Sequence, residues 1–251
     1  MIVGHQGRLE ALAATVPSCI FATVSGAHLY GFESPDSDVD LRGAFVHPLR
    51  SQLGLRRPRE THDKMLHEDG LELDFVAHDV RKCVRLAATG SGEVLEQICS
   101  PLVVLSTPWH DELRALADGC ITRQLHRHYS GFFASRRKLL AAPDATVKHL
   151  LYAYRAALSG IVALRAGRID ANLPSLLTER PVDGVADLTE RKRRGAEKGA
   201  LDAGEIEQHM PLLRALDCEL DRARAHCSLP EAPTHHRALD DFLVRVREAH
   251  R

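Results

Sequence analysis

Hydrophobic residues follow two different spacings along the chain, and the change from one to the other comes near residue 108. Before that point they alternate with polar residues or form short apolar runs, a pattern typical of β-strands. It predicts three strands, at 19–24, 38–46 and 71–77. Apolar residues spaced by three and four positions predict helices at 8–16, 80–89 and 93–98. The first part of the chain is therefore expected to mix strands and helices.

Beyond about residue 108 the strand signals give way to long amphipathic segments, in which apolar positions recur with the period of an α-helix. These segments predict four helices, at 110–142, 144–167, 203–227 and 236–250. The stretch 181–198 is open to two interpretations, a loop or a helix with a solvated basic face. We expect an α+β fold, with a mixed β-sheet flanked by helices in a domain at 1–107 and an all-helical domain at 108–251.

The balance of charges excludes a strongly basic or strongly acidic protein. Lys and Arg number 33 and Asp and Glu 34 among 251 residues, so the formal net charge of −1 gives no reason to expect nucleic acid or an anionic membrane as a partner. No stretch approaches the roughly 20 apolar residues of a membrane span, and the first residues lack the apolar core of a signal peptide. We expect no membrane association and a cytoplasmic location.

Cysteines and histidines do not occur at the spacings of metal sites. None of the six cysteines belongs to a C-x-x-C pair, and several lie inside apolar runs, as Cys19 does, which indicates reduced, buried thiols. The pairs His126/His128 and His235/His236 lack companion ligands at zinc-site spacing. We therefore predict no zinc site.

Two aspartates on one predicted strand carry the strongest chemical signal. Asp38 and Asp40 are separated by Val39, and because side chains alternate across a strand, both carboxylates are expected on one face. Asp74, in the strand predicted at 71–77, is a third acid in an apolar setting. Carboxylate oxygens are ligands of hard cations such as Mg²⁺, which keep positions open for substrate phosphates. If Asp38 and Asp40 are considered without Asp74, the competing interpretation is that they are solvated acids at the edge of a strand.

A small-residue turn follows the first predicted strand. Ser25, Gly26 and Ala27 come directly after the apolar run that ends at Val24. A tight turn there can bring backbone N–H groups to a phosphate, and the absence of a side chain at Gly26 permits a close approach. Together the strand, the turn, the acidic strand and the third acid predict a site for a metal ion and a phosphate-bearing substrate.

Three longer stretches carry a family resemblance: SGAHLYGFESPDSDVDLRGAFVHP, LELDFVAHDVRKCVRLAATGSGEVLEQICSP and KHLLYAYRAALSGIVALRAGRIDANLP. They resemble the DNA polymerase beta-like nucleotidyltransferase superfamily, and more closely a bacterial group of predicted nucleotidyltransferases. The likeness covers most of residues 20–177. It implies a nucleotidyltransferase-type sheet and assigns metal binding and catalysis to three acids, Asp38, Asp40 and Asp74. The turn that cradles the phosphates is then formed by Ser25 and Gly26.

The reaction that the resemblance implies is transfer of a nucleoside monophosphate from a nucleoside triphosphate, ATP among them, to a hydroxyl group, with release of pyrophosphate. Mg²⁺, with Mn²⁺ as the alternative, would hold the triphosphate and neutralise charge on the leaving group. The acceptor stays open between a small molecule, a protein and RNA. Ala27 departs from the family pattern, which usually has serine after the glycine, and the lost hydroxyl removes one hydrogen bond worth roughly 0.5–1.5 kcal/mol.

One face of a predicted helix offers further candidates. Lys148, Tyr152 and Arg155 recur at i, i+4 and i+7, so they share a face on which two cations flank an aromatic ring. Such a stripe can meet a triphosphate and stack on a base, which makes the three residues candidates for nucleotide binding. A solvated helix face is the equally weighted alternative. Arg42, on the same strand face as Asp40, is expected to pair with one of the acids rather than with substrate.

Two other classes of protein stay open. A nucleotide-binding or partner-binding module of the same fold, with weak or no transfer activity, is favoured by Ala27 and opposed by the presence of all three acids. A metal-dependent phosphohydrolase would need His and Asp clusters that the sequence lacks. The sequence carries no signature of the base preference, the acceptor or the oligomeric state.

Overall fold

Two compact units make up the structure, a computed structural model that describes residues 5–68, 70–195 and 199–251. The first unit combines Met1–Gly26, Asp38–Cys120 and Pro233–Arg251, and the second combines Ala27–Ser37 and Ile121–Ala232. This outline differs from the sequence-based division into 1–107 and 108–251, because a short early segment joins the helices and the last helix joins the sheet. Each unit is therefore assembled from segments that are distant in sequence.

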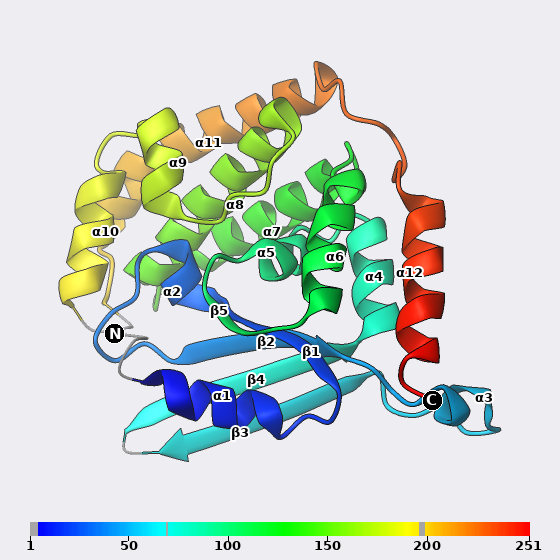
Figure 1. Cartoon of the computed structure of the whole chain (residues 1–251). Coiled ribbons are helices and arrows are strands. Elements are labelled where there is room, and N and C mark those ends of the chain that lie inside the picture. The colour runs from blue at the N-terminus through cyan, green and yellow to red at the C-terminus, as the bar shows by residue number, and fades with distance from the viewer. Residues whose placement is uncertain (1–4, 69, 196–198) are drawn as a thin grey trace. The chain divides into compact units, whose positions relative to one another are not determined.

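A five-stranded mixed sheet is the framework of the first unit, with the strand order β3-β4-β2-β1-β5 (Figure 1). The strands are β1 (Cys19–Val24), β2 (Val39–Phe45), β3 (Thr61–Glu68), β4 (Leu71–Asp79) and β5 (Val103–Ser106). β2 and β4 run parallel, and the other neighbouring strands are antiparallel. The mixed sheet flanked by helices that the sequence predicts is confirmed.

One face of this sheet is buried beneath α1 (Gln6–Ala14). Leu9 and Leu12 of the helix join Val24, Leu41 and Phe75 of three neighbouring strands in one apolar cluster, in which each of these five side chains is at most 2% exposed. Because side chains alternate along a strand, the residues between these core positions face the other side of the sheet.

The opposite face is covered by α5 (Gly92–Cys99) and α6 (Pro108–Ala117). The Thr23 hydroxyl of β1 donates to the Gln97 carbonyl of α5 at 2.8 Å. The Phe21 ring of β1 stacks on the His110 ring of α6, with 4.5 Å between the ring centroids. Short connecting elements complete this unit, namely α3 (Leu49–Leu53) and the 3₁₀ helix η2 (Asp118–Cys120).

Asp79 joins the end of β4 to α4 (Val80–Ala88) and α12 (His236–Glu248). Its Oδ1 accepts a hydrogen bond from the Arg81 backbone N–H at 3.0 Å, which is the helix cap expected from the sequence. Arg247 of α12 donates to the same oxygen at 2.5 Å and to the His47 carbonyl at 2.9 Å. The side chains of Arg247 and Asp79 are only 10% and 3% exposed, so a buried ion pair holds the last helix in the first unit.

Helices make up the second unit, with α8 (Val147–Ala166) buried along most of its length. The others are α2 (Gly26–Tyr30), α7 (Leu125–Leu139), α9 (Leu173–Glu179), α10 (Val185–Arg194) and α11 (Ala203–Ala225). A Cβ atom built at Gly160 of α8 would lie 2.7 Å from the Tyr129 Cβ of α7 and 2.8 Å from the Leu220 Cδ1 of α11. The missing side chain therefore lets three helices pack closely at this point.

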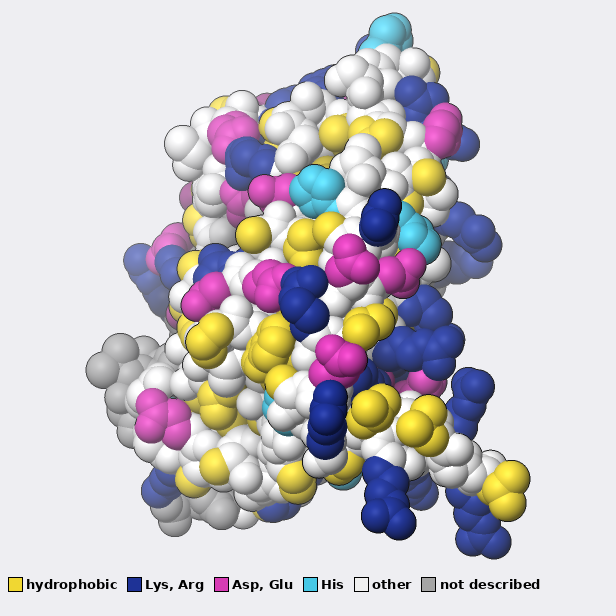
Figure 2. Space-filling model, turned by 45° about the vertical axis from the view of Figure 1, so that its right-hand side comes forward, with side chains coloured by type: hydrophobic (Ala, Val, Ile, Leu, Met, Phe, Trp, Pro, Cys, Tyr) yellow, Lys and Arg dark blue, Asp and Glu magenta, His cyan; other side chains and the backbone are white. Residues whose placement is uncertain are grey.

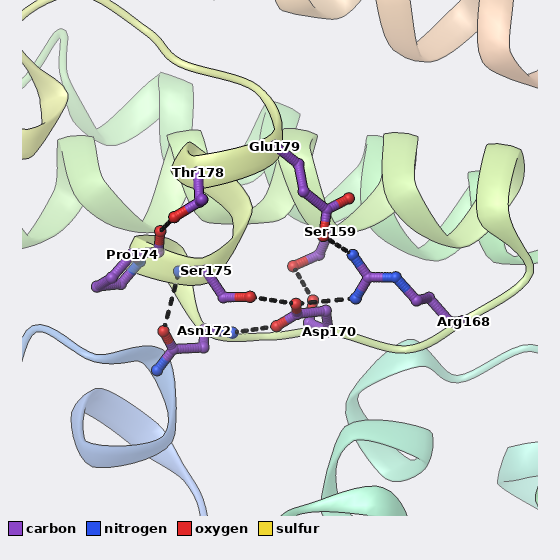
Figure 3. A network of polar contacts seen from close by, with 8 residues as sticks. All are labelled: Ser159, Arg168, Asp170, Asn172, Pro174, Ser175, Thr178 and Glu179. Carbon is purple, nitrogen blue, oxygen red and sulfur yellow. Dashed lines mark hydrogen bonds and ion pairs between the residues drawn. The ribbon is translucent and has the colours of Figure 1, made fainter.

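Asp170 organises the connection between α8 and α9 (Figure 3). Its carboxylate accepts from Arg168 at 2.9 Å, from the Ser175 hydroxyl at 2.8 Å and from the Asn172 backbone N–H at 2.9 Å. The Ser159 hydroxyl of α8 donates to the Asp170 carbonyl at 2.7 Å, and Asn172 caps α9 by accepting from the Ser175 backbone N–H at 3.1 Å. Charge-assisted hydrogen bonds thus define the path of this loop.

Several elements differ from the sequence-based expectation. The sequence patterns missed β3, β5, α2, α3 and α9, which are short or, like β3, mostly polar at the edge of the sheet. The single helix predicted at 110–142 is wrong, because η2 separates α6 from α7. In the stretch 181–198 the helical interpretation is right for α10, while residues 196–198 lie outside the described part of the chain.

The six cysteines are all free, as predicted, but they are not all buried. Cys218 is exposed on α11, and Cys19 is half-buried, so the expectation of six buried thiols is wrong. Burial raises the pKa of the Cys83 thiol to about 12, which makes this cysteine an unreactive core residue at neutral pH.

The surface carries charges of both signs. Figure 2 shows Lys and Arg side chains interspersed with Asp and Glu over much of one face, in accord with the formal net charge of −1. In the part of the chain that the structure describes, no helix is long and apolar enough to cross a membrane.

Candidate active site

Asp40 on β2 and Asp74 on β4 lie opposite each other in the register of the parallel strand pair. Leu41 and Phe75, the next residue on each strand, belong to the apolar cluster beneath α1, so the two carboxylates point to the other face of the sheet. Their side chains are 20% and 28% exposed. The fold thus brings together two of the three acids that the sequence singles out.

Arg42 links these two carboxylates. Its Nη2 donates to Asp40 Oδ1 at 2.6 Å and to Asp74 Oδ2 at 2.9 Å. Its Nη1 donates to the backbone carbonyls of Leu41 and Asp74, both at 2.9 Å. One guanidinium group is therefore held by two side chains and two carbonyls, and its charge is shared between the acids. The expected pairing of Arg42 with an acid is confirmed, and it extends to both.

Gly26 brings the backbone against Asp40. A Cβ atom built at Gly26 would lie 1.9 Å from Asp40 Oδ2, and the glycine has a φ of +61°, which is unfavourable for other residues. The Ser25 backbone N–H donates to the Asp40 carbonyl at 2.8 Å. The turn predicted after β1 is thus in contact with the acidic strand, although the chain continues from Gly26 into the short helix α2 rather than into an open turn. Ala27, the next residue, is 2% exposed.

Asp38 lies immediately before β2 and is half-buried. In the described ranges 5–68, 70–195 and 199–251, no three His, Cys, Asp or Glu side chains are grouped so that they could hold a metal ion. The assignment of Asp38, Asp40 and Asp74 as metal ligands therefore stays a prediction. The chemistry of the donors suits a hard cation, because all of them are carboxylate oxygens.

The electrostatics of this strand face also affect His78, four residues after Asp74 on β4. Its Nδ1 is 3.2 Å from the Thr61 hydroxyl oxygen, and the same oxygen accepts a hydrogen bond from Lys82 Nζ at 2.6 Å. Burial, followed by the charges of Lys82 and Arg42, lowers the pKa of His78 to about 4. His78 is consequently neutral at pH 7, and the arginine is the positive charge beside the two acids.

The predicted nucleotide-binding residues Lys148, Tyr152 and Arg155 all lie on α8, in the second unit. The Lys148 Nζ is 5.8 Å from the centroid of the Tyr152 ring. Arg155 is 2% exposed, and its guanidinium carbon lies 3.9 Å from the centroid of the Tyr30 ring. Arg155 is thus buried in a cation–π contact with Tyr30.

A pocket of about 520 Å³ lies near the start of α8 in the second unit. Lys148 and Tyr152 line it, together with Arg136, Pro143, Asp144, Ala145, Thr146, His149 and Ala200. The Arg136 guanidinium carbon is 5.4 Å from the centroid of the Tyr152 ring. Two of the three helical candidates therefore border a cavity, and two cations approach the same aromatic ring.

Lys192 is a candidate functional residue that the sequence pattern did not predict. It belongs to the basic run 191–194, which suggests a solvated face, yet it is 1% exposed and its Nζ donates to the Ser34 hydroxyl at 2.7 Å. The hydroxyls of Ser34 and Ser37 are 2.9 Å apart, and the Ser34 backbone N–H donates to Ser37 Oγ at 3.0 Å. A buried lysine thus orders the segment that leads into β2. The signal that could have found it is helical spacing from two buried residues, Val185 and Leu188.

Comparison with known proteins gives matches over most of the chain. A family described as the RNA repair pathway DNA polymerase beta family matches residues 1–245. The uncharacterized protein MJ0002 of Methanocaldococcus jannaschii is 30% identical over 159 residues, which cover 62% of this chain and 64% of that protein, slightly less than two thirds of its length. The uncharacterized protein YcgL of Bacillus subtilis is 25% identical over 187 residues, 71% of each chain.

Among solved structures, a nucleotidyltransferase-like protein from Exiguobacterium sibiricum 255-15 aligns over 99% of this chain and 80% of that protein. The sequence identity is 11% and the TM-score is 0.36.

Proposed function

The chain belongs to the RNA repair pathway DNA polymerase beta family, and from this premise we propose that it is a Mg²⁺-dependent nucleotidyltransferase. It would move a nucleoside monophosphate from a nucleoside triphosphate to a hydroxyl group and release pyrophosphate. The observation that carries the proposal is the register of Asp40 and Asp74, whose carboxylates share the Arg42 guanidinium. Phosphoryl transfer relies on positioning and on stabilisation of negative charge, and paired carboxylates that hold a cation serve both.

The residues that would hold the cation, Mg²⁺ or Mn²⁺, are Asp38, Asp40 and Asp74. Bound there, the cation supplies charge neutralisation for the triphosphate and the departing pyrophosphate. The proposal is supported by the placement of Asp40 Oδ1 and Asp74 Oδ2, which both lie within 2.9 Å of Arg42 Nη2 and so already share one positive charge. In an alternative role, Asp74 would not bind the cation, and one of its carboxylate oxygens would accept the proton of the attacking hydroxyl.

Ser25 and Gly26 would help to hold the phosphates. The absence of a side chain at Gly26 places the backbone against the Asp40 carboxylate, which favours backbone N–H contacts with a triphosphate bound at that acid. Ala27 offers no hydroxyl, so phosphate binding would depend on backbone donors.

The pocket of the second unit has the chemistry of a nucleotide site. Lys148 and Arg136 supply positive charge for phosphate, and the half-buried Tyr152 ring offers a stacking surface for a base. Arg155, buried against Tyr30, would then support this site rather than contact the nucleotide. We expect Tyr152→Ala to weaken binding of ATP and other nucleoside triphosphates. An unchanged affinity would show that Tyr152 does not belong to the nucleotide site.

The acceptor stays open between RNA, a small molecule and a protein. The name of the family refers to an RNA repair pathway, so RNA is the first acceptor to test. Purified protein is incubated with each labelled nucleoside triphosphate, Mg²⁺ or Mn²⁺, and RNA with defined ends, and the label is followed. A cell extract replaces RNA in a parallel reaction, which detects label on a protein or a small molecule.

Carboxylate variants test the assignment of the site. Asp40→Asn and Asp74→Asn are expected to lower transfer by about 100-fold or more, because each removes a charge that would hold the cation. Glu72→Gln is the matched control, since Glu72 is an exposed acid on the same strand as Asp74. Full activity in either aspartate variant would refute the proposal. Triphosphate binding without transfer to any acceptor would favour the non-catalytic binding module.

A further inference from the structure

A second pocket of the helical unit, about 510 Å³ in volume, is rich in arginine and has no role in the proposed transfer. It is lined by Arg165, Arg180, Glu219, Arg222, Ala223 and His226. Arg165 lies at the end of α8, and Arg180 directly follows α9. The others lie in the second half of α11 or, as His226 does, directly after it. Three arginines around one carboxylate form a local concentration of positive charge in a chain whose net charge is −1.

Glu219 is the buried carboxylate that binds two arginines of this pocket. Its side chain is 9% exposed, and it accepts from Arg165 Nη1 at 2.8 Å and from Arg180 Nη2 at 2.9 Å. Burial by itself raises the pKa of Glu219, but the hydrogen bonds and charges of Arg180 and Arg165 outweigh it, so the pKa is lowered. The carboxylate is therefore ionised at neutral pH and holds both guanidinium groups in place.

The remaining charge of the pocket is not balanced within it. Arg165, Arg180 and Arg222 contribute +3 and Glu219 contributes −1, which gives a formal charge of +2 for these lining residues. Arg165 uses only Nη1 toward Glu219 and is 52% exposed, so donors of its guanidinium group are accessible from solvent. Arg222 follows Glu219 by one helical turn and is also exposed.

We propose that this pocket binds a terminal phosphate group, a phosphomonoester. A phosphomonoester carries about −1.5 to −2 charges at pH 7, which matches the +2 of the pocket better than the single charge of a phosphodiester does. Guanidinium groups carry several N–H donors that match phosphate oxygens. Two of the three are already oriented by Glu219, Arg165 through Nη1 and Arg180 through Nε and Nη2. The phosphate could belong to a free nucleotide or to the end of an RNA strand. The proposal does not rest on the transfer activity proposed above.

The test is isothermal titration calorimetry of the full chain in EDTA, without any divalent cation. The probes are inorganic phosphate, AMP against adenosine, and a short oligoribonucleotide with and without a 5′-phosphate. Arg222→Ala is expected to weaken binding of the phosphorylated probes by about tenfold or more, and Arg222→Lys by less, because lysine keeps the charge without the paired donors. Arg224→Ala is the matched control, an exposed arginine on the same helix that does not line the pocket.

Whichever of AMP and the 5′-phosphorylated strand binds with the higher affinity identifies the source of the phosphate. Equal affinities for wild type and Arg222→Ala would overturn the proposal, as would an equal loss in Arg224→Ala. Adenosine and the unphosphorylated strand binding as tightly as their phosphorylated counterparts would overturn it as well. The titrations contain no divalent cation, so a lack of phosphate binding would not contradict the transfer proposal. A lack of transfer activity would likewise not contradict phosphate binding in this pocket.

Discussion

A Cβ atom at Gly26 would lie 1.9 Å from Asp40 Oδ2, so these two residues can adjoin only because one of them has no side chain. Backbone atoms of the turn after β1 thereby reach the carboxylate that is proposed to hold the cation. The positive φ of Gly26 adds a second reason for glycine at this position.

Gly26→Ala is expected to lower transfer activity strongly, because the new methyl group displaces the Asp40 carboxylate. It also forces alanine into a left-handed conformation, which costs about 1–2 kcal/mol of stability. Activity and thermal unfolding are measured together. Gly7→Ala is the control, since a Cβ at Gly7 of α1 meets nothing within 4 Å. Wild-type activity in Gly26→Ala would show that the contact with Asp40 is not needed.

Arg42→Met should destabilise the metal-free protein, because two facing carboxylates lose the cation between them. We expect a loss of about 1–3 kcal/mol in the free energy of unfolding, and added Mg²⁺ should recover part of it. Denaturant unfolding with and without Mg²⁺ measures both effects. Arg50→Met, an exposed arginine of α3, provides the comparison. An Arg42 variant as stable as wild type without metal would contradict the role of the guanidinium.

The stability of the first unit should fall as the pH is lowered from 6.5 to about 4. Burial and the charges of Lys82 and Arg42 lower the pKa of His78 to about 4 from an ordinary value of 6.5. Between these values the unfolded chain binds the proton and the folded chain does not, so the free energy of unfolding decreases with falling pH in this window. His78→Gln should show a shallower decrease. His67→Gln, at an exposed position on β3, is the control. Identical pH profiles for His78→Gln and wild type would refute this effect.

Arg247→Met is expected to lower the free energy of unfolding by about 3–5 kcal/mol, because it leaves the buried Asp79 carboxylate without its positive partner. Arg245 lies on the same helix, pairs with Glu112 and is 50% exposed. Arg245→Met should therefore change the same free energy by only about 0–1 kcal/mol. Equilibrium denaturation of the two variants measures the difference. Similar losses in both would show that burial does not distinguish the two ion pairs.

The local sequence was sufficient for much of the first unit. Runs such as 19–24 and 71–77 are strands because their apolar side chains suit a half-buried pleated surface, and Asp79 caps a helix because its side chain reaches a backbone N–H two residues away. Both effects act within a few residues. β3 escaped prediction because it is an edge strand, held by backbone hydrogen bonds to β4 rather than by an apolar pattern.

Contacts between distant segments decided the rest. The sequence by itself indicated the α+β class and marked Asp38, Asp40 and Asp74 as the candidate acids, because alternation and motif are local properties. The pairing of Asp40 with Asp74 depends on the register of two strands that are separated along the chain, and the bridging by Arg42 follows from that register. Lys192 is similarly buried against Ser34 although its sequence neighbours are basic. Strand register and burial are set by the packing of the whole unit, and for that reason only the tertiary structure could define them.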